Sequence, residues 1–405
     1  MEQNLTANNE YGSTSDKASP TAASSSGEKV GAGSIRTRCM YGLFLLLGFG
    51  LCLLFRVHVM EFITKWQIIH DTDCTSTECI ANQSAYRISF ALWIFFFIHM
   101  LLSSNCNLCM KPSQKINFNK GGFLFRVIAL IPLLILAFVI PNAFFVFYAW
   151  FSVVLSVLFL LAQLIILLDF SYNWSESWAS QEETRYQIGL FVCAGLLYVG
   201  GLTFIGLLYH WYGYESSCKT GQGMISVTLI AMILYTFLSI VTAHGSIIPS
   251  GTVFVYTVWS TYSALASGFQ NQTECNKLAA TNTTQLVIAI IFCGISLAYT
   301  CINAANSRSS FQLSSGDDEE PVDAEAQEAS NFTFFHGIMM LGACYMAMLV
   351  TGWDISGSNG TGMAGVDGGA TPMWVKFGTE IVCILLYIWT LIAPKMCGDR
   401  EFDMA

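Results

Sequence analysis

The stretch "NAFFVFYAWFSVVLSVLFLLAQLIILLD", residues 142–169, contains no proline, no glycine and no charged side chain before Asp169. A helix of about 28 residues, at 1.5 Å per residue, is about 42 Å long. That length exceeds the bilayer hydrocarbon core of about 30 Å. The stretch therefore predicts a strongly tilted transmembrane helix, and Pro141 predicts a turn just before it.

Nine further apolar runs surround this one. Hydrophobic residues make up 54% of the chain and charged residues 11%, whereas a soluble domain has about 25% charged residues. Most runs hold about the 20 apolar residues that a membrane-spanning helix needs, and they do not alternate as β-barrel strands do. We expect an all-α integral membrane protein with ten transmembrane helices, at residues 40–57, 86–104, 123–140, 143–169, 186–209, 223–243, 252–267, 285–302, 332–352 and 373–393.

The positions of lysine and arginine predict the orientation. Basic residues of short loops favour the cytoplasmic side, and they cluster before the first run and after the second, at Lys29, Arg36, Arg38, Lys111, Lys115, Lys120 and Arg126. Both termini are therefore expected in the cytoplasm. Residues 1–38, rich in small polar residues, predict a disordered cytoplasmic tail. Residues 39–313 would hold helices one to eight, 314–330 an acidic cytoplasmic loop, 331–394 helices nine and ten, and 395–405 the cytoplasmic C-terminus.

The loops assigned to the opposite side carry two features of an oxidising compartment. Their cysteines Cys74, Cys79, Cys218 and Cys275 can form disulfides, although the sequence leaves the pairing open. Asn82, Asn271, Asn282 and Asn359 are N-x-S/T acceptors for N-glycosylation. Both features predict a membrane of the secretory pathway or the plasma membrane.

Polar residues inside the apolar runs are the first candidates for function. Lys376 lies four residues before Glu380, on the same helix face, where an ion pair would reduce the cost of burial. Pairing would make Glu380 structural, whereas a water-filled groove would make it functional. For these residues, as for Gln163, the alternative is a hydrogen bond between helices or a side chain that reaches the interface.

Asp169 stands at the end of the long run, where a carboxylate opposes the helix dipole and needs a basic partner. Arg126, near the cytoplasmic end of the third run, is the candidate. Tyr172, Trp174 and Trp178 follow, and such aromatic residues gather at membrane interfaces. They are therefore expected to mark where the long helix leaves the lipid.

Motifs of enzymes are absent from the sequence. It has no G-x-x-x-x-G-K-[ST], no H-E-x-x-H and no G-x-S-x-G. We therefore predict no enzymatic activity, no cofactor and no metal site. No basic patch suggests nucleic acid as a partner.

The segment "QLIILLDFSYNWSESW", residues 163–178, resembles the Q-L-V-L-L-x-D-F-x-x-x-W-x-E-S-W segment of the serine incorporator (SERINC) family. Four further segments resemble the family in the same order: "YRISFALWIFFF", "YTVWSTYSALAS", "FFHGIMMLGACYMAMLVTGW" and "WVKFGTEIVCILLYIWTLIAP". The resemblance runs from about residue 40 to 405. It implies two helical bundles crossed by a long tilted fourth helix, with lipid-accessible grooves beside it.

The same resemblance implies a membrane protein that acts on lipids. The expected activity is ATP-independent scrambling of phospholipids such as phosphatidylserine, linked to the incorporation of serine into phosphatidylserine and sphingolipids. Membrane phospholipids, and sterol or sphingolipid, are the expected ligands. The family's S-S-S in the last span is "GTE" here, so Glu380 falls outside the resemblance.

Two other functions stay open. The acidic loop could recruit lipid-biosynthetic enzymes or trafficking adaptors, which would make the protein a scaffold. A secondary transporter of serine is the third hypothesis, although the inverted repeats typical of such transporters are not evident. Homo-oligomerisation is also left open.

Overall fold

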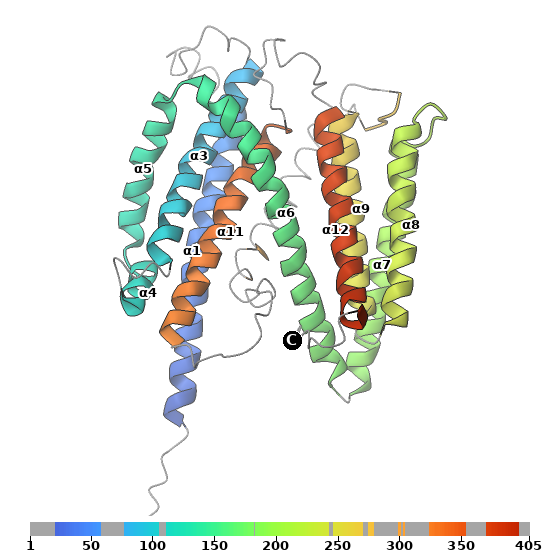
Figure 1. The fold of residues 1–405 in the computed structure, drawn as a ribbon, viewed down its shortest axis with the longest axis horizontal. Helices are drawn as coiled ribbons and strands as arrows, with labels where there is room; N and C mark the ends of the chain where they lie inside the picture. Colours follow the sequence, from blue (N-terminus) through green and yellow to red (C-terminus); the bar gives the residue numbers. More distant parts are fainter. Residues whose placement is uncertain are drawn as a thin grey trace, which may run out of the picture.

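The computed structural model describes residues 21–57, 77–104, 111–181, 183–242, 246–269, 274–278, 299–300, 303, 324–353 and 370–396. Within them the regular structure is ten helices (Figure 1). The helices are α1 (Thr21–Val57), α3 (Thr77–Ser103), α4 (Pro112–Lys120), α5 (Phe123–Val139), α6 (Asn142–Ala179), α7 (Thr184–Tyr212), α8 (Lys219–Val241), α9 (Ile247–Gly268), α11 (Ala324–Val350) and α12 (Ala370–Met396). Seven helices of the described chain are long and apolar enough to cross a membrane, or eight if the bent pair α4 and α5 is one span. The predicted all-α membrane fold is confirmed, and the run 285–302 lies almost wholly outside the described residues.

The helices form two groups with α6 between them (Figure 1). Helices α1, α3, α4, α5 and α11 pack together and are called the first bundle, and α7, α8, α9 and α12 form the second bundle. Among the described helices, α6 packs on α3 and α11 on one side and on α7, α9 and α12 on the other. In Figure 1, α6 runs diagonally across the array, as its length predicted.

Each bundle buries a different face of α6. Phe159, Ala162 and Ile166 belong to the core of the first bundle, whereas Leu164 and Leu168 belong to the core of the second. At 3.6 residues per turn these two sets lie on different sides of the helix. Helix α6 therefore contributes to both hydrophobic cores, and neither bundle alone would bury both of its faces.

Several helices extend beyond the apolar runs. Helix α6 continues to Ala179, ten residues past the expected end at Asp169. Helix α1 begins at Thr21, inside the segment expected to be a disordered tail, and α11 begins at Ala324, inside the expected acidic loop. Hydropathy marks where a segment prefers lipid, whereas a helix continues as long as each added residue completes a backbone hydrogen bond. Residues 314–323, the rest of that loop, lie outside the described residues.

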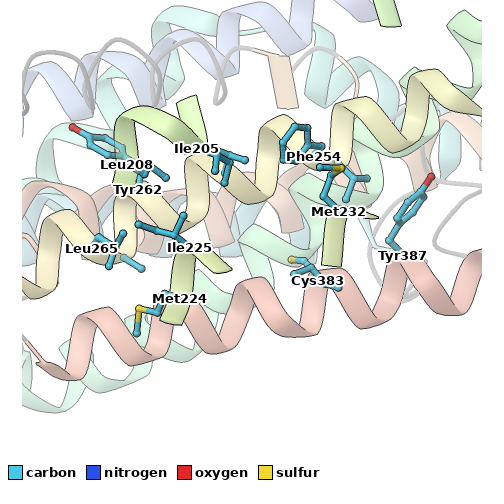
Figure 2. Packing of buried hydrophobic residues seen from close by; sticks show 14 of the residues in the cluster. Ile205, Leu208, Met224, Ile225, Met232, Phe254, Tyr262, Leu265, Cys383 and Tyr387 are labelled. Carbon is cyan, nitrogen blue, oxygen red and sulfur yellow. The ribbon is translucent and has the colours of Figure 1, made fainter. Parts of the chain in front are cut away.

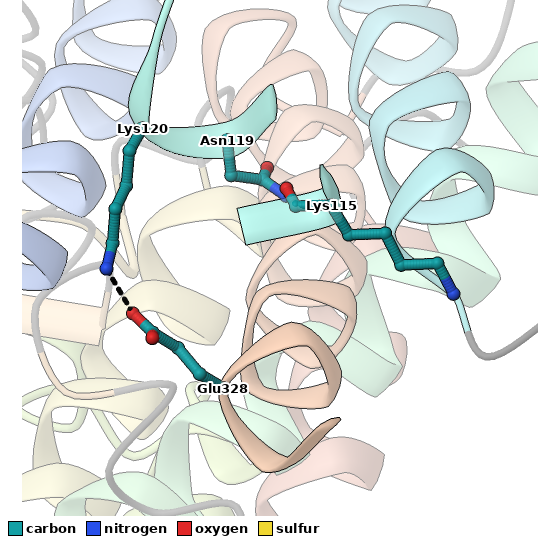
Figure 3. Close-up of polar contacts among 4 residues, drawn as sticks. All are labelled: Lys115, Asn119, Lys120 and Glu328. Atoms are coloured by element: carbon teal, nitrogen blue, oxygen red, sulfur yellow. Dashed lines mark hydrogen bonds and ion pairs between the residues drawn. The ribbon is translucent and has the colours of Figure 1, made fainter. Parts of the chain in front are cut away.

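An ion pair holds the early turns of α11. Lys120 Nζ, at the end of α4, lies 2.8 Å from Glu328 Oε1 on α11 (Figure 3). On the same short helix, Lys115 Nζ donates to the carbonyl of Ser104, which follows α3. Two lysines that the orientation rule counted as loop charges therefore also connect α4 to its neighbours.

A sharp elbow separates α4 from α5. The two helices are bent by 79°, and Gly122 adopts a left-handed φ of 72° at the turn, which favours glycine. Asn119 fastens the elbow, because its Nδ2 donates to Ser103 Oγ at 2.9 Å and its Oδ1 lies 2.8 Å from His336 Nε2. The elbow is thus anchored to α3 and α11.

Helix α9 is the centre of the second bundle. It packs on α6, α7, α8 and α12, and Figure 2 shows its Phe254, Tyr262 and Leu265 among side chains of those neighbours. It is not one of the seven described helices that are long and apolar enough to cross a membrane, and it buries small and hydroxyl-bearing residues, including Ser250, Thr257, Thr261, Ala264 and Ser267. Small residues let neighbouring helices approach closely. A helix surrounded by protein needs less apolar surface than one surrounded by lipid.

The first and last described helices agree with one predicted feature of the topology, namely that both termini lie on the same side. Helix α1 begins and α12 ends at the same edge, the lower one in Figure 1. A cytoplasmic location for that edge stays a prediction.

Candidate functional site

A row of polar contacts joins α6 to α9. The contacts are Ser171 Oγ to Thr252 Oγ1 at 3.1 Å, Ser175 Oγ to Ser246 Oγ at 2.8 Å, and the Tyr256 hydroxyl, which donates to the carbonyl of Leu160 at 3.1 Å. Hydrogen bonds of this kind replace water as partners inside a membrane. They hold the long helix in register with the second bundle over much of its length.

Gln163 and Asp169 lie on α6 with half-buried side chains. Gln163 stands between Ala162, which faces the first bundle, and Leu164, which faces the second. Asp169 lies near Tyr299, whose ring packs edge-on against Phe170 with the centroids 5.4 Å apart. The structure therefore places both predicted residues at the boundary between the bundles.

The predicted pairing of Asp169 with Arg126 is wrong. Arg126 is buried in the first bundle, where its guanidinium donates to the carbonyl of Phe118 and lies 4.7 Å from the centre of the Tyr41 ring. Because α6 is tilted away from α5, the start of α5 and the end of α6 lie far apart (Figure 1). Arg126 finds its acceptor and its aromatic partner on α4 and α1 instead.

The aromatic residues after Asp169 lie on the helix and separate into two faces. Trp174 continues a row of rings from Phe170 at 6.1 Å to Trp178 at 5.3 Å. Gly189 on α7 leaves room for Trp178, because a Cβ there would lie 2.7 Å from its ring. Tyr172 points the other way and packs against the core of the second bundle. A location of Trp174 and Trp178 at the membrane interface stays a prediction.

Of the two alternatives left open for Glu380, the ion pair with Lys376 is not formed. The ion pairs of the described residues do not include it. Lys376 Nζ donates to the carbonyl of Ser263 on α9 at 3.1 Å and lies 5.4 Å from the centre of the Trp353 ring. Glu380 Oε1 instead accepts from Thr228 Oγ1 on α8 at 2.7 Å. Two side chains one turn apart thus bond to other helices and not to each other, Lys376 to α9 and Glu380 to α8 and α9.

Three buried residues with central roles were missed from the sequence. Thr228 and Thr261 contact Glu380, but threonine is common in membrane helices and nothing local distinguishes these two. Arg87 could have been found, because an arginine at the start of an apolar run is costly unless paired. It is 2% exposed and donates to the Gln83 side chain and to the carbonyl of Ile140.

The predicted extracellular features are only partly within the described chain. Cys218 and Cys275 form a disulfide with the Cα atoms 5.6 Å apart, and Cys79 is also disulfide-bonded. Asn82 is half-buried in the first turns of α3. The remaining predicted positions, Cys74, Asn271, Asn282 and Asn359, lie outside the described residues.

The described residues contain no group of three or more His, Cys, Asp or Glu that could hold a metal ion. What the site offers is a set of hydrogen-bonding groups on a helix that both bundles share. Such a set can accompany a polar group across a membrane or hold two bundles together.

Comparison with known proteins identifies the family. The signature described as Serine incorporator (Serinc) matches residues 17–331 and 309–400. The chain is 28% identical over 446 residues to serine incorporator 3 of Bos taurus, which covers 91% of this chain and 93% of that protein. It is 27% identical over 425 residues to the probable serine incorporator of Nematostella vectensis, covering 91% and 92%. The resemblance seen in separate segments is confirmed over most of the length, and the chain belongs to the serine incorporator family.

Proposed function

We propose that this protein is an ATP-independent phospholipid scramblase that moves phosphatidylserine between leaflets, in connection with serine-derived phosphatidylserine and sphingolipid metabolism. The observation that carries the proposal is α6, a helix of 38 residues between two bundles with the half-buried polar side chains of Gln163 and Asp169 at the boundary. The relatives are named serine incorporators. That name supports a lipid with a serine headgroup as the cargo.

Energetics favour a path along this helix. A polar or charged headgroup in hydrocarbon without partners costs several kcal/mol. The Gln163 amide can donate and accept hydrogen bonds, and the Asp169 carboxylate can accept them from the ammonium of serine. The two residues are six positions apart, or about 9 Å along the helix. They are also about 120° apart around the helix, so each offers a partner to a headgroup on its own side of α6 while the acyl chains stay in the lipid.

Three of the predicted polar residues are left out of this path. Glu380 is fully buried and faces α8 and α9. Lys376 is bonded to α9, and Arg126 lies in the first bundle. Their contacts are with protein, so they supply no partner to a headgroup that moves along α6.

Reconstitution tests the proposal. The full chain is placed in liposomes that contain fluorescent phosphatidylserine, and dithionite then bleaches the outer leaflet. We expect exchange between leaflets without ATP, well above the rate in protein-free liposomes. Exchange at the protein-free rate would rule out scrambling by this protein alone.

A matched pair of variants tests the path. Asp169→Asn keeps the shape of the side chain and removes its charge, and we expect slower exchange of phosphatidylserine. Glu176→Gln removes an exposed charge seven positions further along the same helix, and we expect no change. Equal effects of the two variants would contradict a special role for Asp169.

A further inference from the structure

The second bundle encloses a carboxyl group that the proposed lipid path does not use. Glu380 of α12, Thr228 of α8 and Thr261 of α9 are all 0% exposed. Their side chains meet where the three helices pack on one another. Any role for this cluster is therefore independent of lipid movement along α6.

The three side chains form a closed triangle of short contacts. Thr228 Oγ1 lies 2.7 Å from Glu380 Oε1 and 2.7 Å from Thr261 Oγ1. Thr261 Oγ1 lies 2.9 Å from Glu380 Oε2 and also 2.9 Å from Glu380 Oε1. All these separations are those of O–H···O hydrogen bonds. Each group therefore contacts both of the others as a hydrogen-bonding partner.

The number of protons decides the state of this triangle. Each threonine hydroxyl supplies one proton, and an ionised carboxylate supplies none. Two protons cannot fill three contacts, so one pair of oxygens would face each other with lone pairs only. Main-chain carbonyls compete for the same two protons, because Met224 O lies 3.1 Å from Thr228 Oγ1 and Thr257 O lies 3.0 Å from Thr261 Oγ1.

A third proton completes the ring. With a proton on Glu380 Oε1, the carboxyl donates to Thr228, Thr228 donates to Thr261, and Thr261 donates to Glu380 Oε2. Each pair among the three side chains then shares one proton, with one donor and one acceptor. We propose that the second bundle contains a proton-binding site, in which the proton resides on Glu380 and is held by Thr228 and Thr261.

The described surroundings offer no substitute for that proton. Among the described residues, the other titratable groups near Glu380 are the hydroxyls of Tyr235 on α8 and Tyr256 on α9, the Cys383 thiol, and Lys376. Of these only Lys376 is a cation, and it donates to the carbonyl of Ser263. A buried carboxylate without a paired cation is strongly unfavourable, and such a group takes up a proton instead.

A metal ion fits the number of ligands less well. Calcium takes about six to eight oxygen ligands, whereas the side chains of Glu380, Thr228 and Thr261 supply four oxygens. The separations of 2.7–2.9 Å between these oxygens are those of hydrogen bonds.

Infrared spectroscopy of the full chain in lipid nanodiscs tests the proposal. The Glu380→Gln variant can keep the ring, because its amide donates to Thr228 and accepts from Thr261. We expect the wild-type minus variant spectrum at neutral pH to contain the C=O band of a protonated carboxyl, shifted in D₂O. If the variant folds and the difference spectrum contains carboxylate bands in place of that band, the proposal is overturned.

Thermal unfolding gives a second readout. If the folded bundle binds one more proton here than the unfolded chain, stability falls as pH rises. We expect the wild-type Tm to fall from mildly acidic to alkaline pH, and Glu380→Gln to lose part of that dependence. Sodium or calcium that raises the wild-type Tm, but not that of Glu380→Gln, would assign the site to a metal ion.

A hydroxyl-retaining pair keeps the test decisive if the glutamine variant does not fold. Thr261→Ser preserves the ring and changes its geometry, so the carboxyl band should shift. Thr390→Ser on α12 is the control, because the Thr390 hydroxyl donates to the Tyr387 carbonyl and does not touch Glu380. A carboxyl band that neither change moves would belong to another group and would contradict the assignment.

Discussion

The guanidinium of Arg87 on α3 donates to the main-chain carbonyl of Ile140 at 3.0 Å. Ile140 lies just beyond the end of α5, and Pro141 precedes α6. The same guanidinium donates to the Gln83 side chain at 2.9 Å and lies 4.4 Å from the centre of the Phe145 ring on α6. One buried side chain thus holds the turn from which the tilted helix starts.

Arg87→Lys is expected to destabilise the protein by about 2 kcal/mol, because one ammonium cannot replace the planar fork of donors and a buried group without its partner costs about 1–3 kcal/mol. Thermal unfolding in detergent micelles measures the change. Arg185→Lys is the control, since that side chain is 71% exposed. Equal losses in both variants would show that Arg87 has no special role in the turn.

Two adjacent glycines of α7 should respond in opposite ways to alanine. A Cβ at Gly201 would lie 2.3 Å from the Phe254 ring, whereas Gly200 has nothing within 4 Å. We expect Gly201→Ala to cost about 1–3 kcal/mol through overpacking. Gly200→Ala should be neutral or stabilising by up to about 1 kcal/mol, because alanine favours helix. Denaturant unfolding of the two variants in parallel measures their free energies of unfolding. Similar free energies for both would contradict the close packing of α7 on α9.

Tyr256→Phe should loosen α6 from the second bundle. The substitution removes the hydroxyl that donates to the Leu160 carbonyl, and hydrogen bonds between membrane helices are worth about 0.6 kcal/mol on average. Hydrogen exchange should become faster in the middle of α6. Tyr186→Phe is the control, since the Tyr186 hydroxyl makes no hydrogen bond among the described residues. Unchanged exchange in α6 would mean that this contact adds nothing to its attachment.

Cys275→Ser should destabilise the second bundle. The disulfide to Cys218 closes a loop across 57 positions. In the chain-entropy model, a disulfide that closes a loop of that size stabilises the folded state by about 4 kcal/mol. Reducing agent should lower the wild-type Tm in the same way. Cys193→Ser changes a free cysteine of α7 and should have little effect. A wild-type Tm that stays constant after reduction, verified by mass spectrometry, would contradict a stabilising role.

Much of the fold could be predicted from apolar runs. The nine predicted runs within the described chain all coincide with helices, and the length of residues 142–169 predicted the tilt of α6. The ends of the helices could not be predicted. Ala179, for example, ends α6 in a polar sequence, where contacts such as Ser175 to Ser246 and the Trp178 ring on α7 hold the last turns.

The sequence identified the polar residues of the candidate site but not their interaction partners. Sequence spacing showed that Lys376 and Glu380 share a helix face, and loop order suggested Arg126 for Asp169. The pair suggested for Asp169 is wrong and the possible pair of Lys376 with Glu380 is not formed, because Ser263, Thr228 and Phe118 on other elements offer closer partners. Spacing tells which side chains can meet, and competition among neighbours decides which do.

The sequence by itself determined that this is a helical membrane protein, because the lipid core imposes length and apolarity on each span separately. It also indicated the serine incorporator family, through residues 163–178 and four further segments. Tertiary structure alone decided which residues share a polar contact. The ring joins Glu380 to Thr228 and Thr261, which lie 152 and 119 positions before it in the chain. Such contacts depend on how helices pack, and the hydropathy of a single segment contains no information about its neighbours.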